Sequence, residues 1–113
     1  MTIMDFTKVK IVTFAPIEDA DKIRQALGKA GAGVIGEYTF CSYSSLGKGR
    51  FTPSSNANPH IGKPNKPEVV EEERIEVVCE RSNAKSVIAA LKEAHPYEEV
   101  AVDIYPLIDE DQL

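Results

Sequence analysis

The chain has 113 residues, of which 42% are hydrophobic and 27% charged, and its net charge is -5. This length favours a single domain, residues 1–113, and the acidic balance argues against generic nucleic-acid binding, which needs a basic surface. No apolar run approaches the roughly 18 residues that cross a bilayer. The N-terminal stretch "MTIMDFTKVK" lacks the basic start and apolar run of a secretory signal. We therefore expect a cytoplasmic protein with no membrane partner.

The first half of the chain predicts a strand, a helix and a second strand. Residues 7–16, "TKVKIVTFAP", alternate and are rich in β-branched side chains, which is typical of a strand. Residues 17–33 have apolar side chains at helical spacing and end in glycines that suit a helix stop. Residues 35–45, "IGEYTFCSYSS", alternate again and predict the second strand. The helical stripe consists of Ala20, Ile23, Leu27 and Ala30.

A long loop is predicted over residues 46–68. This segment holds three of the seven glycines and four of the seven prolines, and it has no periodicity. A loop of this length inside a small domain is usually functional or disordered.

The second half repeats the pattern of the first. Residues 69–81, "VVEEERIEVVCER", predict a strand in which Glu72 faces away from its two glutamate neighbours, while Arg74 and Glu76 share one face. A helix capped by Ser82 or Asn83 follows and ends at His95-Pro96, because a proline disfavours helical geometry in the residue before it. Residues 100–107, "VAVDIYPL", predict the last strand.

The order β-α-β, loop, β-α-β predicts an α+β fold. Right-handed crossovers bring both helices to one face of one sheet, which gives a ferredoxin-like sandwich with a four-stranded antiparallel sheet. Cys41 and Cys79 have no CxxC spacing, and we expect both to be buried thiols.

The stretch "GKGRF", residues 47–51, allows two interpretations. Glycines that adopt positive φ can point several amides at one anion, and Lys48 and Arg50 would add charge. Alternatively, Gly47 and Gly49 only bend the end of the second strand. The spacing matches neither a Walker loop nor a dinucleotide-binding fingerprint.

The stretch "HPYEE", residues 95–99, combines side chains used in metal and acid–base sites. His95 at a helix C-terminus would be favoured in its protonated form by the helix dipole. Pro96 indicates that the helix has already ended, so His95 and Glu98 do not share a helical face by default. His60 in the loop is expected to be exposed, with a metal or anion contact as the alternative.

Taken together, "YTFCSYSSLGKGRFTPSSNANPHIGK", "EEERIEVVCE" and "VIAALKEAHPYEEVAVDIYPL" resemble the inserted domain of the Nif-three-like family (the NGG-one-interacting-factor-three-like proteins). The resemblance implies a stand-alone domain similar to the trimeric CutA and PII proteins, with ligand clefts between subunits. In the family this insert lies between two halves that carry a two-metal site, and no metal residue of those halves matches a position in this sequence.

The leading hypothesis is a non-enzymatic ligand-binding or regulatory domain that forms a homotrimer and binds a small anion or nucleotide. A second hypothesis is binding of a divalent metal ion, copper or zinc, by His60, His95 and Glu98. A small enzyme that uses His95 or Glu98 as a base ranks last, because no nucleophile is evident, and we predict neither catalytic residues nor a cofactor. The predicted ligand-binding residues are Gly47, Lys48, Gly49, Arg50, Phe51, His60, Gly62, His95, Tyr97 and Glu98.

Overall fold

The structure is a computed structural model that describes residues 5–113. Residues 1–4, part of the N-terminal stretch that argues against a secretory signal, lie outside the described residues. The order of strands and helices is the predicted one. The elements are β1 (Lys8–Pro16), α1 (Ala20–Lys29), β2 (Tyr43–Phe51), β3 (Glu68–Glu80), α2 (Ala84–Ala94) and β4 (Val102–Leu107), with short 3-10 turns η1 (Ile17–Asp19), η2 (Arg81–Asn83) and η3 (Glu110–Gln112).

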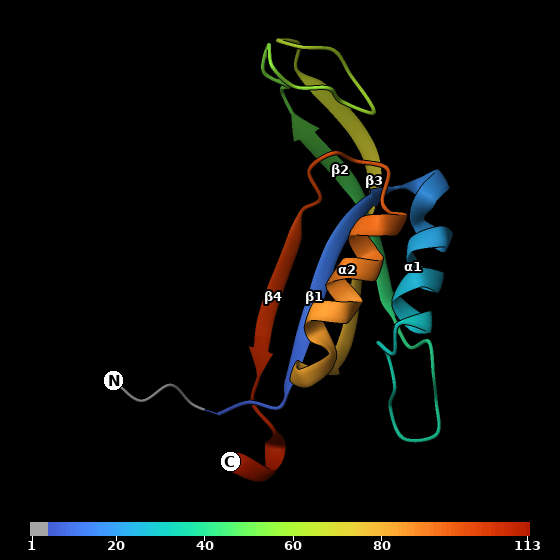
Figure 1. The fold of residues 1–113 in the computed structure, drawn as a ribbon, viewed down its shortest axis with the longest axis vertical. Helices are drawn as coiled ribbons and strands as arrows, with labels where there is room; N and C mark the ends of the chain where they lie inside the picture. Colours follow the sequence, from blue (N-terminus) through green and yellow to red (C-terminus); the bar gives the residue numbers. More distant parts are fainter. Residues whose placement is uncertain (1–4) are drawn as a thin grey trace.

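The strands form one four-stranded sheet in the order β2-β3-β1-β4, and each neighbouring pair is antiparallel. Both helices lie on the same face of this sheet (Figure 1). This arrangement confirms the predicted ferredoxin-like α+β sandwich. The core between sheet and helices contains Val9, Ile11, Ala15, Ala20, Ile23, Leu27, Ala32, Ile75, Val77, Cys79, Val87 and Leu91.

Within residues 5–113, no helix lies over the other face of the sheet, and we call it the open face. Arg74 and Glu76 share this face, as predicted, and pair with each other at 3.3 Å. Lys10 joins Glu76 at 3.2 Å, and the Arg74 guanidinium lies 5.8 Å from the centre of the Phe14 ring. The strand register places Lys10, Val12, Phe14, Tyr43, Glu72, Arg74, Glu76 and Tyr105 on the open face.

Strands β2 and β3 continue past the end of β1 as a two-stranded arm. Pro16, the last residue of β1, pairs with Glu72, and residues 48–51 then pair with residues 68–71 alone. Figure 1 shows this ribbon projecting beyond the sheet, with the loop of residues 52–67 at its tip. The corner between α2 and β4, which holds "HPYEE", lies near the base of this arm.

The predicted position of the second strand was wrong. Residues 46–51 belong to β2, not to the loop predicted over residues 46–68, because they pair with β3 residue by residue. Phe40, placed in the middle of the predicted strand, has a positive φ of 57°, and its ring covers Gly28 of α1. Pairing with β3 and packing on α1 therefore overrode the local alternation of residues 35–45. At the other edge, β4 begins at Val102 instead of residue 100.

Other local predictions can be compared directly with the structure. Gly31 and Gly33 have φ of 100° and 79°, which confirms them as the stop after α1. Cys79 is buried as predicted, whereas Cys41 is partly exposed because its segment lies outside the sheet core; both thiols are free. Within residues 5–113, none of the helices has the length and hydropathy needed to span a membrane.

Candidate functional site

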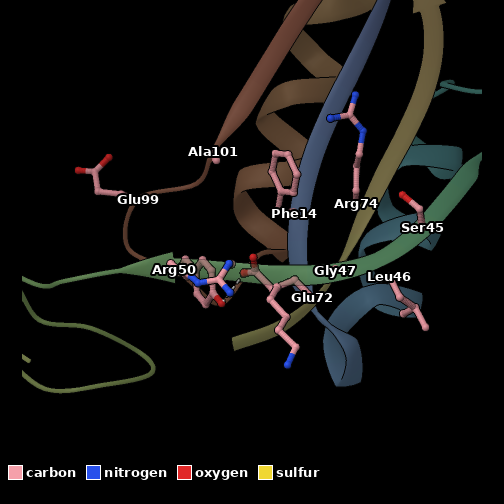
Figure 2. Close-up of a pocket in the computed structure, with 12 residues that line it drawn as sticks. Phe14, Ser45, Leu46, Gly47, Arg50, Glu72, Arg74, Glu99 and Ala101 are labelled. Carbon is pink, nitrogen blue, oxygen red and sulfur yellow. Dashed lines mark hydrogen bonds between the residues drawn. The ribbon is translucent and has the colours of Figure 1, made fainter. Parts of the chain in front are cut away.

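Two adjoining hollows lie where the arm meets the corner between α2 and β4. The first, the strand hollow, has a volume of about 510 Å³, and Figure 2 shows the residues around it. The second, the loop hollow, has a volume of about 330 Å³. The strand hollow is lined by Phe14, Ser45, Leu46, Gly47, Lys48, Gly49, Arg50, Glu72, Arg74, Tyr97, Glu99 and Ala101. The loop hollow is lined by Phe51, Thr52, Pro53, Ala57, Pro59, His60, Ile61, Tyr97, Glu98 and Glu99.

Tyr97 lines both hollows and is held by a buried carboxylate. Its hydroxyl donates a 2.9 Å hydrogen bond to Glu72 Oε2, and Glu72 is only 8% exposed. A carboxylate in this position needs partners, because burial of an unpaired charge is costly. Burial of the phenol, reinforced by the hydrogen bond to Glu72, raises the pKa of Tyr97. The phenol therefore stays protonated as a donor at neutral pH.

Gly49 makes room for that carboxylate. A Cβ on Gly49 would collide with Oε1 of Glu72, whereas a Cβ on Gly47 would meet nothing within 4 Å. Both glycines lie on the same side of β2. Because Gly49 has no side chain, Glu72 can lie against β2 while its carboxylate accepts the hydrogen bond from Tyr97.

His95 is a buried helix stop, 6% exposed. Its backbone leaves helical geometry with ψ of 136°, as expected before Pro96. Nε2 lies 2.7 Å from the carbonyl oxygen of Phe14, and Nδ1 accepts the backbone N–H of Tyr97 at 3.1 Å. A carbonyl can only accept and an N–H can only donate, so these contacts select the neutral Nε2–H tautomer. The predicted protonated imidazole is therefore not the form that this hydrogen bonding favours.

Glu98 fastens the loop of residues 52–67 to the corner. Its Oε2 accepts the backbone N–H of Asn58 at 2.7 Å. The rings of Phe51 and His60 each lie 6.4 Å from the Tyr97 ring, centre to centre, and both are tilted to it. Inside the loop, the Asn65 N–H donates to the Pro53 carbonyl at 2.6 Å. These contacts form the loop hollow within a single chain.

The structure brings most of the predicted site residues to these two hollows. Gly47, Lys48, Gly49 and Arg50 line the strand hollow, and Phe51, His60 and Glu98 line the loop hollow, with Tyr97 between the two sets. Two predicted residues line neither hollow: His95 lies buried beneath the corner, and Gly62 forms a turn with φ of 92°.

The anion-binding interpretation of "GKGRF" was wrong in its geometry. Neither Gly47 nor Gly49 has a positive φ, and residues 47–51 are extended and paired with β3, so their amides do not converge on one point. The alternative, a bend at the end of the second strand, was also wrong, since the strand runs on to Phe51. Any charge from this stretch comes from the Lys48 and Arg50 side chains.

The three residues of the metal hypothesis are not brought together. Among residues 5–113, no group of three His, Cys, Asp or Glu side chains is arranged to hold a metal ion. Both ring nitrogens of His95 are engaged in hydrogen bonds within the chain. Metal binding stays a prediction, one that requires His95 to give up these bonds.

The sequence did not identify Glu72, Phe14, Arg74 and Glu99 as site residues. Alternation already set Glu72 apart from Glu71 and Glu73. That signal could not show that Tyr97, which follows the next helix, would be its partner.

Comparisons with known proteins place the chain among relatives that are much longer. No protein-family model matches it. Curated proteins named "GTP cyclohydrolase 1 type 2 homolog" from Halalkalibacterium halodurans and Bacillus subtilis are 46% and 49% identical over 103 and 98 residues. These alignments cover 91% and 87% of this chain but only 28% and 26% of the relatives. The chain thus spans about a quarter of the length of the curated relatives it matches.

The solved structures include one much longer relative and two proteins of similar length. A Bacillus cereus protein related to NIF3 matches with a TM-score of 0.80 and 42% identity, over 96% of this chain and 28% of that one. The periplasmic divalent cation tolerance protein CutA from Archaeoglobus fulgidus matches with a TM-score of 0.66 and 19% identity, over 90% of this chain and 85% of that one. GlnK from B. subtilis matches with a TM-score of 0.58 and 17% identity, over 89% and 85%. At such identities the last two comparisons show the fold alone.

We predict that Gly49→Ala destabilises the protein while Gly47→Ala does not. The new Cβ at residue 49 must displace Glu72 from Tyr97, at a cost of about 1–3 kcal/mol. The same change at residue 47 meets open space and serves as the matched control. Urea unfolding of both variants measures the difference; equal midpoints would contradict the packing described here.

Tyr97 should ionise at higher pH than a free tyrosine, because burial and the hydrogen bond to Glu72 raise its pKa. The unfolded phenol titrates near pH 10. Above that pH the unfolded chain releases a proton that the folded chain keeps. The contribution of Tyr97 to the free energy of unfolding should therefore be fully present below about pH 10 and decrease as the pH rises further. Tyrosinate absorbance and unfolding free energies of wild type and Tyr97→Phe test this. An absorbance change near pH 10 that is present in the wild type and missing from Tyr97→Phe would rule it out.

Proposed function

Because the chain is related along nearly its whole length to one segment of the Nif3-like proteins, the "GTP cyclohydrolase 1 type 2 homologs", we propose that it is a small-ligand-binding or regulatory domain. The domain acts without catalysis, in the cytoplasm, as a homo-oligomer and most simply a homotrimer. Its ligand clefts lie between subunits. The cyclohydrolase in the relatives' name refers to chains about four times as long and is not carried over.

The observation that carries this proposal is the open face. Helices cover one face of the sheet only, and the other carries Phe14, Tyr43 and Tyr105, of which the two tyrosines are 68% and 44% exposed. Lys10, Arg74 and Glu76 place both signs of charge beside these rings. A surface that mixes aromatic rings with paired charges suits contact with a second copy of itself.

The sheet edges support self-association as well. β2 and β4 are the outer strands, and each leaves one side of its backbone without a strand neighbour within residues 5–113. Exposed edges of this kind are usually covered or paired in natural proteins. The projecting arm can reach a neighbouring subunit, which would place the strand hollow beside a subunit boundary.

The ligand that suits the strand hollow is a small anion. Lys48 and Arg50 line it and are exposed, and they share the side of β2 opposite to Gly47 and Gly49. Figure 2 shows Arg50 on the β2 strand of the arm. The Glu72 carboxylate in the same hollow already accepts the Tyr97 hydroxyl. A phosphate-bearing ligand such as a nucleotide is the simplest candidate that lysine and arginine side chains would hold together.

We expect light scattering to give about three times the chain mass of 12.4 kDa. Tyr105→Lys should shift the protein toward monomer, because it places a like charge beside Arg74 and Lys10 on the open face. Ile104→Lys is the matched control, since residue 104 is similarly exposed but points to the opposite face. A monomeric wild type, or equal loss of assembly in both variants, would contradict the proposal.

Calorimetry with adenosine and guanosine triphosphates and with pyrophosphate tests the ligand. The double variant Lys48→Gln/Arg50→Gln should weaken binding about three- to tenfold, since exposed ion pairs contribute modestly. Lys85→Gln, an exposed change at the far end of α2, should leave binding unchanged. Absence of heat from all three compounds at millimolar concentration would count against an anionic ligand.

A further inference from the structure

The loop hollow differs in charge from the strand hollow beside it. Lys48, Arg50 and Arg74 line the strand hollow beside the carboxylates of Glu72 and Glu99, whereas the residues that line the loop hollow include no lysine and no arginine. Apart from His60, the acidic and basic side chains at the loop hollow are the carboxylates of Glu98 and Glu99 alone, both exposed, and Glu99 borders both hollows. An anion would therefore find little to bind it there, and a cation would be favoured.

The walls of the loop hollow are aromatic and apolar. The rings of Phe51, His60 and Tyr97 converge with tilted planes, and Pro53, Pro59 and Ile61 complete the lining. Aromatic faces attract cations, and apolar walls favour a ligand with a hydrophobic body. A volume of about 330 Å³ is in the range of small-molecule pockets.

Two hydrogen bonds hold this arrangement in place before any ligand binds. Tyr97 is held by Glu72, which fixes the position of its ring. Glu98 Oε2 holds the backbone N–H of Asn58, so the carboxylate is oriented and one of its oxygens is already occupied. The cost of ordering the site on binding is thereby reduced.

We propose that the loop hollow binds a small organic cation, an amine or guanidinium group attached to a flat or apolar body. The body lies among the rings of Phe51, His60 and Tyr97, and the charged group lies toward the carboxylates of Glu98 and Glu99. The site is built within one chain, so it does not depend on the homo-oligomer or on the anion proposed for the strand hollow.

The experiment compares three probes of similar size and different charge: phenethylamine, 2-phenylethanol and phenylacetate. Amide chemical shifts of residues 51–61 and 97–99, followed by NMR during titration, report where each probe binds and how tightly. We expect phenethylamine to bind most tightly, with an affinity that falls as salt is added, and phenylacetate to bind most weakly.

Matched variants separate charge from shape. Glu98→Gln/Glu99→Gln keeps the size of both side chains and an acceptor for Asn58, and should weaken phenethylamine binding about four- to twentyfold while leaving 2-phenylethanol unchanged. Glu110→Gln, an exposed change at the opposite end of the molecule, should change neither affinity. The proposal is overturned if the neutral or anionic probe binds as tightly as the amine. It is equally overturned if the double variant keeps the amine affinity, or if phenethylamine shifts no residue of the hollow.

Discussion

The hydrogen bond from the Tyr97 hydroxyl to the buried Glu72 carboxylate connects the parts of this molecule that the sheet alone does not join. Glu72 lies where β1 ends and the two-stranded arm begins, and Tyr97 lies in the corner that leads to β4. The contact can form only because Gly49 has no side chain to occupy the space of the carboxylate. Without it, the two hollows would lose their common wall.

The buried Glu72 carboxylate is not needed for stability alone, since hydrophobic packing of the same volume is often at least as stabilising. In this protein the carboxylate fixes the positions of neighbouring side chains. Glu72 orients the phenol, the phenol positions the rings of Phe51 and His60, and Glu98 fixes the loop above them. These contacts hold the side chains that line the two hollows, as supporting contacts do in preorganised sites.

Two kinds of surface remain available in this architecture. The open face carries aromatic side chains and a paired charge network, while the two hollows are concave and share Tyr97 and Glu99 in their linings. The fold shared with CutA and GlnK does not choose among these uses, because function is decided by the site and not by the architecture. The difference in charge between the two hollows is a property of this chain's own side chains.

The sequence alone determined the order of strands and helices, the stop at His95-Pro96, the separation of Glu72 from its neighbours and the shared face of Arg74 and Glu76. These features follow from periodicity and from the local geometry of proline and glycine, which nearby residues are enough to set. Tertiary structure decided where β2 begins, since Tyr43 to Phe51 are a strand only because β3 pairs with them. It also decided the roles of Gly49, His95 and Tyr97. Gly49 and Tyr97 both depend on Glu72, and His95 depends on the carbonyl of Phe14. These partners are far away in the chain, and no local pattern encodes which distant partner a side chain will meet.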